Sequence, residues 1–218
     1  MVTNKANEII LPTVSEAALF NKTITTWARQ NYADYPWRKT KNRWHALVAE
    51  VMLQRTGAEQ VLPVYSAFCD QYETPRDFLL HSDGTMFSSL GLKWREAKLI
   101  ELAEVLSKNN IPEDKELLLQ LPGIGEYIAS AYRALHLGLY DIIIDSNVVR
   151  LYGRYFGFET DGETRRKKEL KALAKMLTSK IDFKTYNYGL IDFTRKTCKL
   201  KPFCSDCILK GSCNHNKG

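Results

Sequence analysis

The chain has 218 residues, which is enough for one large domain or two small ones with hydrophobic cores. Apolar residues make up 44% and charged residues 26%, and no run of about 18 apolar residues is present, so the composition excludes a disordered chain and a membrane-spanning helix. The net charge of +6 fits a polyanionic partner, although many basic proteins bind no nucleic acid.

Helical periodicity dominates the first half of the chain. A helix is predicted from a cap at Ser15 to about Asn31, where the turn at 34–36 stops it because proline cannot continue a helix. A third helix is predicted near 58–72, between a second and a fourth helix that carry apolar stripes. Apolar stripes at helical spacing mark the second and fourth helices, namely Trp44, Leu47, Val48 and Val51, and then Leu99, Leu102, Ala103 and Leu106.

The second half follows the same pattern. Two short helices should flank the segment 121–125, and three more are predicted at about 146–156, 163–179 and 183–194. The run 141–145 looks strand-like, but an isolated strand has no partner, so we interpret it as a buried extended connector. The sequence therefore predicts an all-α protein.

The segment Leu121-Pro-Gly-Ile-Gly125 resembles the turn of a helix-hairpin-helix. Gly123 and Gly125 would permit positive φ and allow a phosphate to approach the free N–H groups that open the next helix. An ordinary tight helix–helix turn is the alternative.

Two carboxylates stand out for their positions. Asp145 ends the apolar run and precedes a helix start, where it could be a plain N-cap or could stabilise a glycosidic transition state with oxocarbenium character. Glu50 lies beside an apolar stripe, where it could be a solvated edge residue or a pocket acid that protonates a departing base. Asp141 is expected at a loop surface.

Four cysteines follow at C-x5-C-x2-C-x5-C spacing: Cys198, Cys204, Cys207 and Cys213. The N-terminus lacks the apolar core of a signal peptide, so we expect a protein of the cytoplasm or nucleoid whose thiols stay reduced. The cluster therefore predicts a metal site rather than disulfides, either a [4Fe–4S] cluster or Zn²⁺. A single C-x2-C pair argues against a zinc ribbon, which has two.

Together these motifs resemble the endonuclease III-like superfamily of helix-hairpin-helix DNA glycosylases with an iron–sulfur loop. The resemblance covers about residues 35–213 and is carried by Trp37-Arg38, the segment 49–56, Gly91-Leu92, the segment 121–127, Val148-Val-Arg150 and the cysteines. It implies two helical domains beside a DNA-binding cleft: a six-helix barrel with the hairpin at 33–139, and a discontinuous domain of 1–32 and 140–218 with the [4Fe–4S] loop. It also implies double-stranded DNA with a mismatched or damaged base as the partner; we expect a monomer and no membrane association.

The branch within the superfamily depends on one position. Members that also cut the strand carry a lysine where this chain has Tyr127, and a phenol cannot form a Schiff base. The chain therefore resembles monofunctional glycosylases, most closely those that remove thymine (or uracil) opposite guanine. The alternative is an adenine glycosylase; those enzymes usually carry a further C-terminal domain, expected to be absent because the chain ends five residues after Cys213. A non-catalytic DNA-binding module with a structural metal is the third hypothesis.

The resemblance also implies a role for each matched residue. Asp145 would be the catalytic carboxylate, and Asn147 would hold Asp145 or the attacking water. Glu50 and Tyr127 would line the base pocket. The residues expected at the DNA are Gln54 and Leu92, which would fill the gap left by a flipped base, together with Arg55, Gly123, Gly125 and Arg150.

Overall fold

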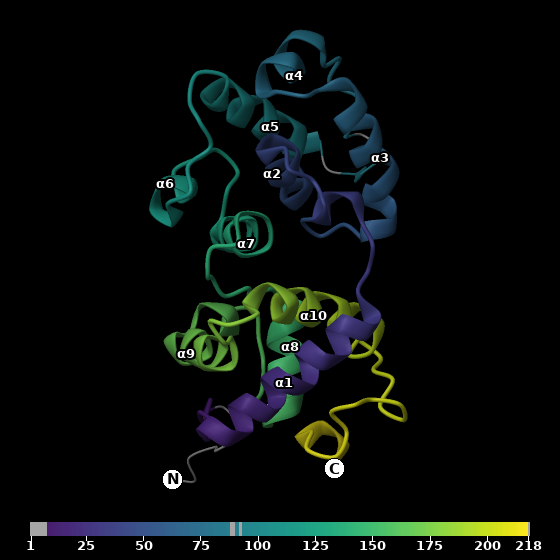
Figure 1. Ribbon diagram of the computed structural model, residues 1–218, viewed down its shortest axis with the longest axis vertical. Helices are drawn as coiled ribbons and strands as arrows, with labels where there is room; N and C mark the ends of the chain where they lie inside the picture. The colour runs from purple at the N-terminus through teal and green to yellow at the C-terminus, as the bar shows by residue number, and fades with distance from the viewer. Residues whose placement is uncertain (1–7, 88–89, 92, 218) are drawn as a thin grey trace. The chain divides into compact units, whose positions relative to one another are not determined.

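The computed structural model describes residues 8–87, 90–91 and 93–217 (Figure 1). Every regular element in these residues is a helix, and they contain no strand. The predicted all-α class is confirmed, and the run 141–145 is an extended connector without ladder pairing.

The chain divides into two compact units, one formed by residues 1–33 and 140–218 and the other by residues 34–139. The first unit contains α1 (Val14–Asn31), α8 (Ser146–Phe156), η5 (Thr164–Arg166), α9 (Lys168–Leu177), α10 (Phe183–Lys196) and η6 (Asn214–Asn216). The second contains η2 (Pro36–Arg38), α2 (Arg43–Met52), α3 (Ala58–Gln71), α4 (Pro75–His81), α5 (Lys93–Leu106), α6 (Lys115–Leu119), α7 (Glu126–Ala131) and the π-helical η4 (Tyr132–Leu137).

In the first unit, α1 packs along α10, and α8 and α9 complete the core. Gly189 makes the α1–α10 approach close, because a Cβ there would lie 2.9 Å from the Cβ of Ala28 and 3.1 Å from the carbonyl oxygen of Ile24. The apolar stripes meet in one buried cluster that includes Phe20, Ile24, Val148, Tyr152, Leu170, Leu173, Leu190 and Phe193.

In the second unit, α2 is the central helix, and every residue from Trp44 to Met52 is buried. It packs against η2, α3, α5, α7 and η4. Aromatic rings close one end of this core through edge-on and tilted contacts among Trp44, Phe68, Tyr72, Phe78 and Phe87. Burial of α2 from Trp44 to Met52 explains why the Glu50 side chain is only 3% exposed.

Capping residues explain two differences from the predicted helices. Thr13, rather than Ser15, caps α1 in a capping box with Glu16. The helix α4 was not predicted, although Thr74, Pro75 and Asp77 supply its cap, its first residue and its capping box.

Two other expectations were wrong. The helix α9 begins only at Lys168, because Asp161 accepts hydrogen bonds from the backbone N–H and hydroxyl of Thr164 and holds that segment in a separate turn. Asp141 is buried, with 8% of its surface exposed, and its carboxylate accepts a hydrogen bond from the N–H of Ile142.

Candidate active site and cysteine loop

Asp145 lies at the N-cap of α8, so the simple capping interpretation describes its local structure correctly. Its Oδ1 accepts a hydrogen bond from the N–H of Val148 at 2.7 Å, and its Oδ2 accepts one from Nδ2 of Asn147 at 2.7 Å. The N-terminus of a helix favours negative charge, because its N–H groups lack intrahelical acceptors. The half-buried carboxylate is thus held in one orientation by donors on the following turn.

A chain of hydrogen bonds connects this carboxylate to the cysteine loop. Arg150 donates from Nη1 to Oδ1 of Asn147 at 2.9 Å, and from Nη2 and Nε to the carbonyl oxygen of Cys198 at 2.9 and 3.3 Å. Burial, with a smaller contribution from Arg154, lowers the pKa of Arg150. Arg150, predicted to contact DNA, therefore also ties the first turns of α8 to the loop that begins at Cys198.

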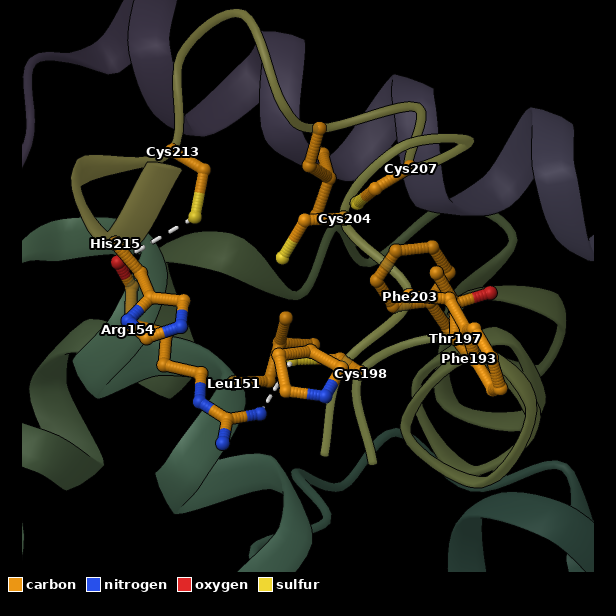
Figure 2. Close-up of a pocket in the computed structure, with 12 residues that line it drawn as sticks. Leu151, Arg154, Phe193, Thr197, Cys198, Phe203, Cys204, Cys207, Cys213 and His215 are labelled. Carbon is orange, nitrogen blue, oxygen red and sulfur yellow. Dashed lines mark hydrogen bonds between the residues drawn. The ribbon is translucent and has the colours of Figure 1, made fainter. Parts of the chain in front are cut away.

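The cysteine loop packs against α8 through a second arginine. Arg154 donates to Sγ of Cys198 at 3.5 Å and to the carbonyl oxygens of Lys199 and Leu200 at 2.5 and 2.8 Å. The four predicted cysteines line one pocket together with Leu151, Arg154 and other residues (Figure 2). Burial raises the pKa of the Cys207 and Cys213 thiols, so binding a metal there would release their protons.

The four thiols form the candidate metal site. Within the described part of the chain, no three His, Cys, Asp or Glu side chains are placed to hold one metal ion together. A tetrahedral Zn²⁺ needs all its sulfurs about 2.3 Å from one point. The four cysteines line a shared pocket, and a [4Fe–4S] cluster would take one cysteine at each of its four irons.

An open, basic groove adjoins the loop. Its walls include Asn147 and Arg150 from α8, Arg195 from α10, and Lys199 and Lys201 from the loop. Four cationic side chains around one groove are suited to a phosphate backbone.

In the other unit, Glu50 occupies the last turns of α2, and its side chain is only 3% exposed. Its Oε1 lies 2.8 Å from Nε2 of His136, whose side chain is 4% exposed. The structure thus rejects the interpretation of Glu50 as a solvated edge residue. His136 had not been selected from the sequence, because no motif or periodicity distinguishes it.

The turn after α2 carries Gln54 and Arg55, and Arg55 adopts a positive φ of 55°. Arg95, fully buried on α5, holds this turn by donating from Nη1 to the carbonyl oxygen of Met52 at 3.0 Å and to Oγ1 of Thr56 at 2.8 Å. Sequence reasoning missed Arg95, since arginine in a charged helix is usually exposed. Leu92, the other predicted gap-filling residue, lies outside the described residues.

The predicted hairpin joins α6 to α7. Gly123 has a φ of 75°, a conformation that favours glycine, and a Cβ there would lie a tight 3.2 Å from the Cβ of Lys98. Gly125 is the N-cap of α7, and a Cβ there would meet no atom within 4 Å. Tyr127 is half-buried in the first turn of α7.

Known proteins share this architecture over nearly the whole chain. A thymine/uracil-DNA glycosylase from Methanothermobacter thermautotrophicus is 31% identical, with 90% of this chain and 93% of that protein covered. A thymine-DNA glycosylase from Aeropyrum pernix is 33% identical, with 83% and 86% covered. The solved structure of a thermostable thymine-DNA glycosylase gives a TM-score of 0.85 at 30% identity, covering 93% of this chain and 97% of that one. No protein-family model matches the chain.

The fold itself is that of a helix-hairpin-helix DNA glycosylase. A non-covalent endonuclease III–DNA complex shares the fold, with a TM-score of 0.82 at 21% identity over 95% of this chain and 98% of that one. The chain belongs to the DNA glycosylase family of these thymine/uracil relatives and has the endonuclease III-like fold, which confirms the predicted resemblance and makes it a DNA N-glycosylase.

Adenine glycosylases are also relatives. The adenine DNA glycosylase of Buchnera aphidicola subsp. Baizongia pistaciae is 30% identical over 89% of this chain, but the match covers only 58% of that protein. None of the helices in the described part of the chain combines the length and apolar composition needed to cross a membrane.

Proposed function

We propose that the protein is a monofunctional DNA glycosylase that acts as a monomer on double-stranded DNA. It would hydrolyse the N-glycosidic bond of a flipped thymine or uracil opposite guanine and leave an abasic site. The observation that carries the proposal is the Asp145 carboxylate, held at the start of α8 by Asn147 and Val148. The thymine/uracil relatives, matched over most of both chains, support the choice of base.

Asp145 is suited to stabilise positive charge on the sugar. As the glycosidic bond breaks, the deoxyribose gains oxocarbenium character, and a nearby carboxylate stabilises that charge or orients the attacking water. Asn147 would keep the carboxylate in place or bind the water. Because both carboxylate oxygens already accept a hydrogen bond, their orientation is set before DNA arrives.

Glu50 and Tyr127 would contact the flipped base, with Glu50 as the proton donor and Tyr127 as a stacking or hydrogen-bonding surface. A tyrosine at position 127 offers no amine for a Schiff base, which supports hydrolysis without strand cleavage. Gln54 and Leu92 would fill the gap in the duplex. Base flipping costs a few kcal/mol, less at a mismatch, so the mispair itself contributes to selectivity.

Phosphate contacts would come from both units. Gly123 and Gly125 leave the backbone of the hairpin accessible, and Arg55 is exposed beside Gln54. In the first unit, Arg150, Arg195, Lys199 and Lys201 would bind the backbone through the basic groove.

We also propose a [4Fe–4S] cluster held by the four cysteines, rather than Zn²⁺. The pocket that all four cysteines line supports this cofactor, because a [4Fe–4S] cluster takes one cysteine at each of its four irons. Cys204→Ser should abolish the visible absorption of iron–sulfur charge transfer in protein purified without oxygen. A colourless wild-type protein containing one equivalent of zinc would contradict the cluster.

Base release from a panel of duplexes tests the function: T·G, U·G, A·G, adenine opposite oxidised guanine, and oxidised pyrimidines. We expect strand breaks at T·G or U·G only after alkali is added. Breaks without alkali would contradict monofunctionality, and release of adenine alone would favour the adenine-glycosylase alternative. Salt-sensitive DNA binding without any abasic product would favour a binding module.

A further inference from the structure

A buried histidine–carboxylate pair lies in the second unit. His136 belongs to the π-helical η4, which packs against α2 and places Nε2 of His136 2.8 Å from Oε1 of Glu50. Both side chains are almost fully buried, at 4% and 3% exposure. π-helical turns are rare and occur often at functional sites.

Burial makes each member of the pair depend on the other. A lone buried carboxylate or imidazolium would pay a large desolvation cost, whereas the pair carries no net charge in two arrangements. In one, Glu50 is a carboxylic acid and His136 a neutral imidazole; in the other, Glu50 is a carboxylate and His136 an imidazolium. Moving one proton along the 2.8 Å contact interconverts them without a change in net charge. The pair therefore holds one proton that can move between the two side chains.

We infer that His136 is a positioning residue for Glu50, and that the pair delivers a proton to the departing base. This inference rests on the proposed function, in which Glu50 contacts that base. The Glu50 carboxyl gives its proton to the base as the glycosidic bond breaks, and the bond's electron pair leaves with the base. Water adds to the sugar carbon and loses a proton, and one proton from solvent restores the pair. The net reaction is hydrolysis.

A purely structural pair would behave differently from a proton-delivering one. Acid assistance matters most for a poor leaving group, and it matters little for a base that is stable as an anion. Thymine is a poorer leaving group than uracil, and the electron-withdrawing fluorine of 5-fluorouracil makes it the best of the three. Loss of the transferable proton should therefore slow thymine release much more than 5-fluorouracil release. General destabilisation of the fold would slow all three equally.

The test is single-turnover base release from T·G, U·G and 5-fluorouracil·G duplexes. His136→Gln keeps a donor for Glu50 but cannot store the proton. We expect thymine release to fall about 10-fold to 100-fold, and 5-fluorouracil release to change less than about 3-fold. Affinity for a duplex with a stable abasic analogue should be unchanged. The double variant Glu50→Gln/His136→Gln should be no slower than Glu50→Gln.

The matched control is His45→Gln. His45, on α2, is also buried, but its Nε2 contacts the carbonyl oxygen of Tyr72 at 2.9 Å, and the nearest carboxylate, 3.9 Å away, belongs to the exposed Glu73. This variant should leave the ratio of the three rates unchanged. Equal slowing of all three bases by His136→Gln, or wild-type rates throughout, would overturn the inference alone. Wild-type protein that releases none of the three bases would overturn the proposed function and this inference together.

Discussion

The two carboxylates proposed to act in base excision occupy opposite environments. Asp145 is half-buried at the start of α8 and is held by two N–H donors that cannot titrate in the physiological range, Val148 N–H and the Asn147 amide. Glu50 is almost fully buried on α2, and its partner His136 can accept or release a proton. The Asp145 carboxylate is thus hydrogen-bonded by fixed N–H dipoles, whereas the Glu50 carboxylate is hydrogen-bonded to an imidazole.

The difference suggests a division of roles. A carboxylate among fixed N–H donors suits charge stabilisation, and a carboxyl with a buried titratable partner suits proton transfer. Environment, rather than residue type, separates the two. The following variants would sharpen or remove this contrast, in order of decreasing expected effect.

Asp145→Asn should have the largest effect. The amide oxygen can still accept the Val148 hydrogen bond, so the fold remains, but the negative charge is lost. We expect base release to fall by at least about 100-fold, with mismatch binding retained. Asp141→Asn is the matched control, four residues earlier and also an acceptor of a local N–H, and it should remain active. Comparable turnover by Asp145→Asn would remove Asp145 from catalysis.

Replacing each of the two residues by alanine should lower the free energy of unfolding by different amounts, because their environments differ. Glu50→Ala leaves His136 buried without its carboxylate partner, and we expect a loss of about 3 kcal/mol in the free energy of unfolding. Asp145→Ala removes a helix cap and should cost about 1 kcal/mol. Urea unfolding followed by circular dichroism measures both. Equal losses would show that the burial contrast has no energetic consequence.

Alkaline pH should destabilise the protein partly through Tyr132, whose ring centroid lies 6.1 Å from that of His136. Burial raises the pKa of Tyr132 from 10.0 to about 12. Because the folded-state pKa is the higher one, this contribution is complete below about pH 10 and is lost as pH rises towards 12. The loss approaches about 2 kcal/mol. Urea midpoints at pH 9 to about 12 should fall less steeply in Tyr132→Phe; parallel slopes would contradict the assignment.

The smallest expected difference in stability is between variants that lack the hydroxyl of Tyr152 or that of Tyr132. In the first unit the hydroxyls of Tyr152 and Tyr186 lie 3.2 Å apart, whereas that of Tyr132 has no partner among the described residues. At pH 7, Tyr152→Phe should therefore destabilise the fold by about 1 kcal/mol. Tyr132→Phe should be neutral or slightly stabilising. Thermal unfolding compares the two, and the reverse order would show that the Tyr132 hydroxyl is satisfied in solution.

Much of this protein could be read from its sequence, because the signals are local. The apolar stripes predict most helices, and the segment 121–125, Asp145 with the following helix start, Tyr127 and the cysteine spacing identify the family. Each of these signals depends on residues only a few positions apart, where backbone geometry determines which side chains can interact. Even the missed helix α4 had such a signal in Thr74-Pro75 and Asp77.

The partners of the functional residues were decided only by the tertiary structure. Glu50 and His136 are 86 positions apart, Arg95 and Met52 are 43 apart, and Arg150 and Cys198 are 48 apart. No local pattern couples such positions, because their contact depends on which helix faces meet when the core packs. The sequence by itself determined the fold class, the family and the two candidate carboxylates. The helix terminus beside Asp145 was a local signal as well, whereas packing alone decided that Glu50 has a buried histidine as its partner.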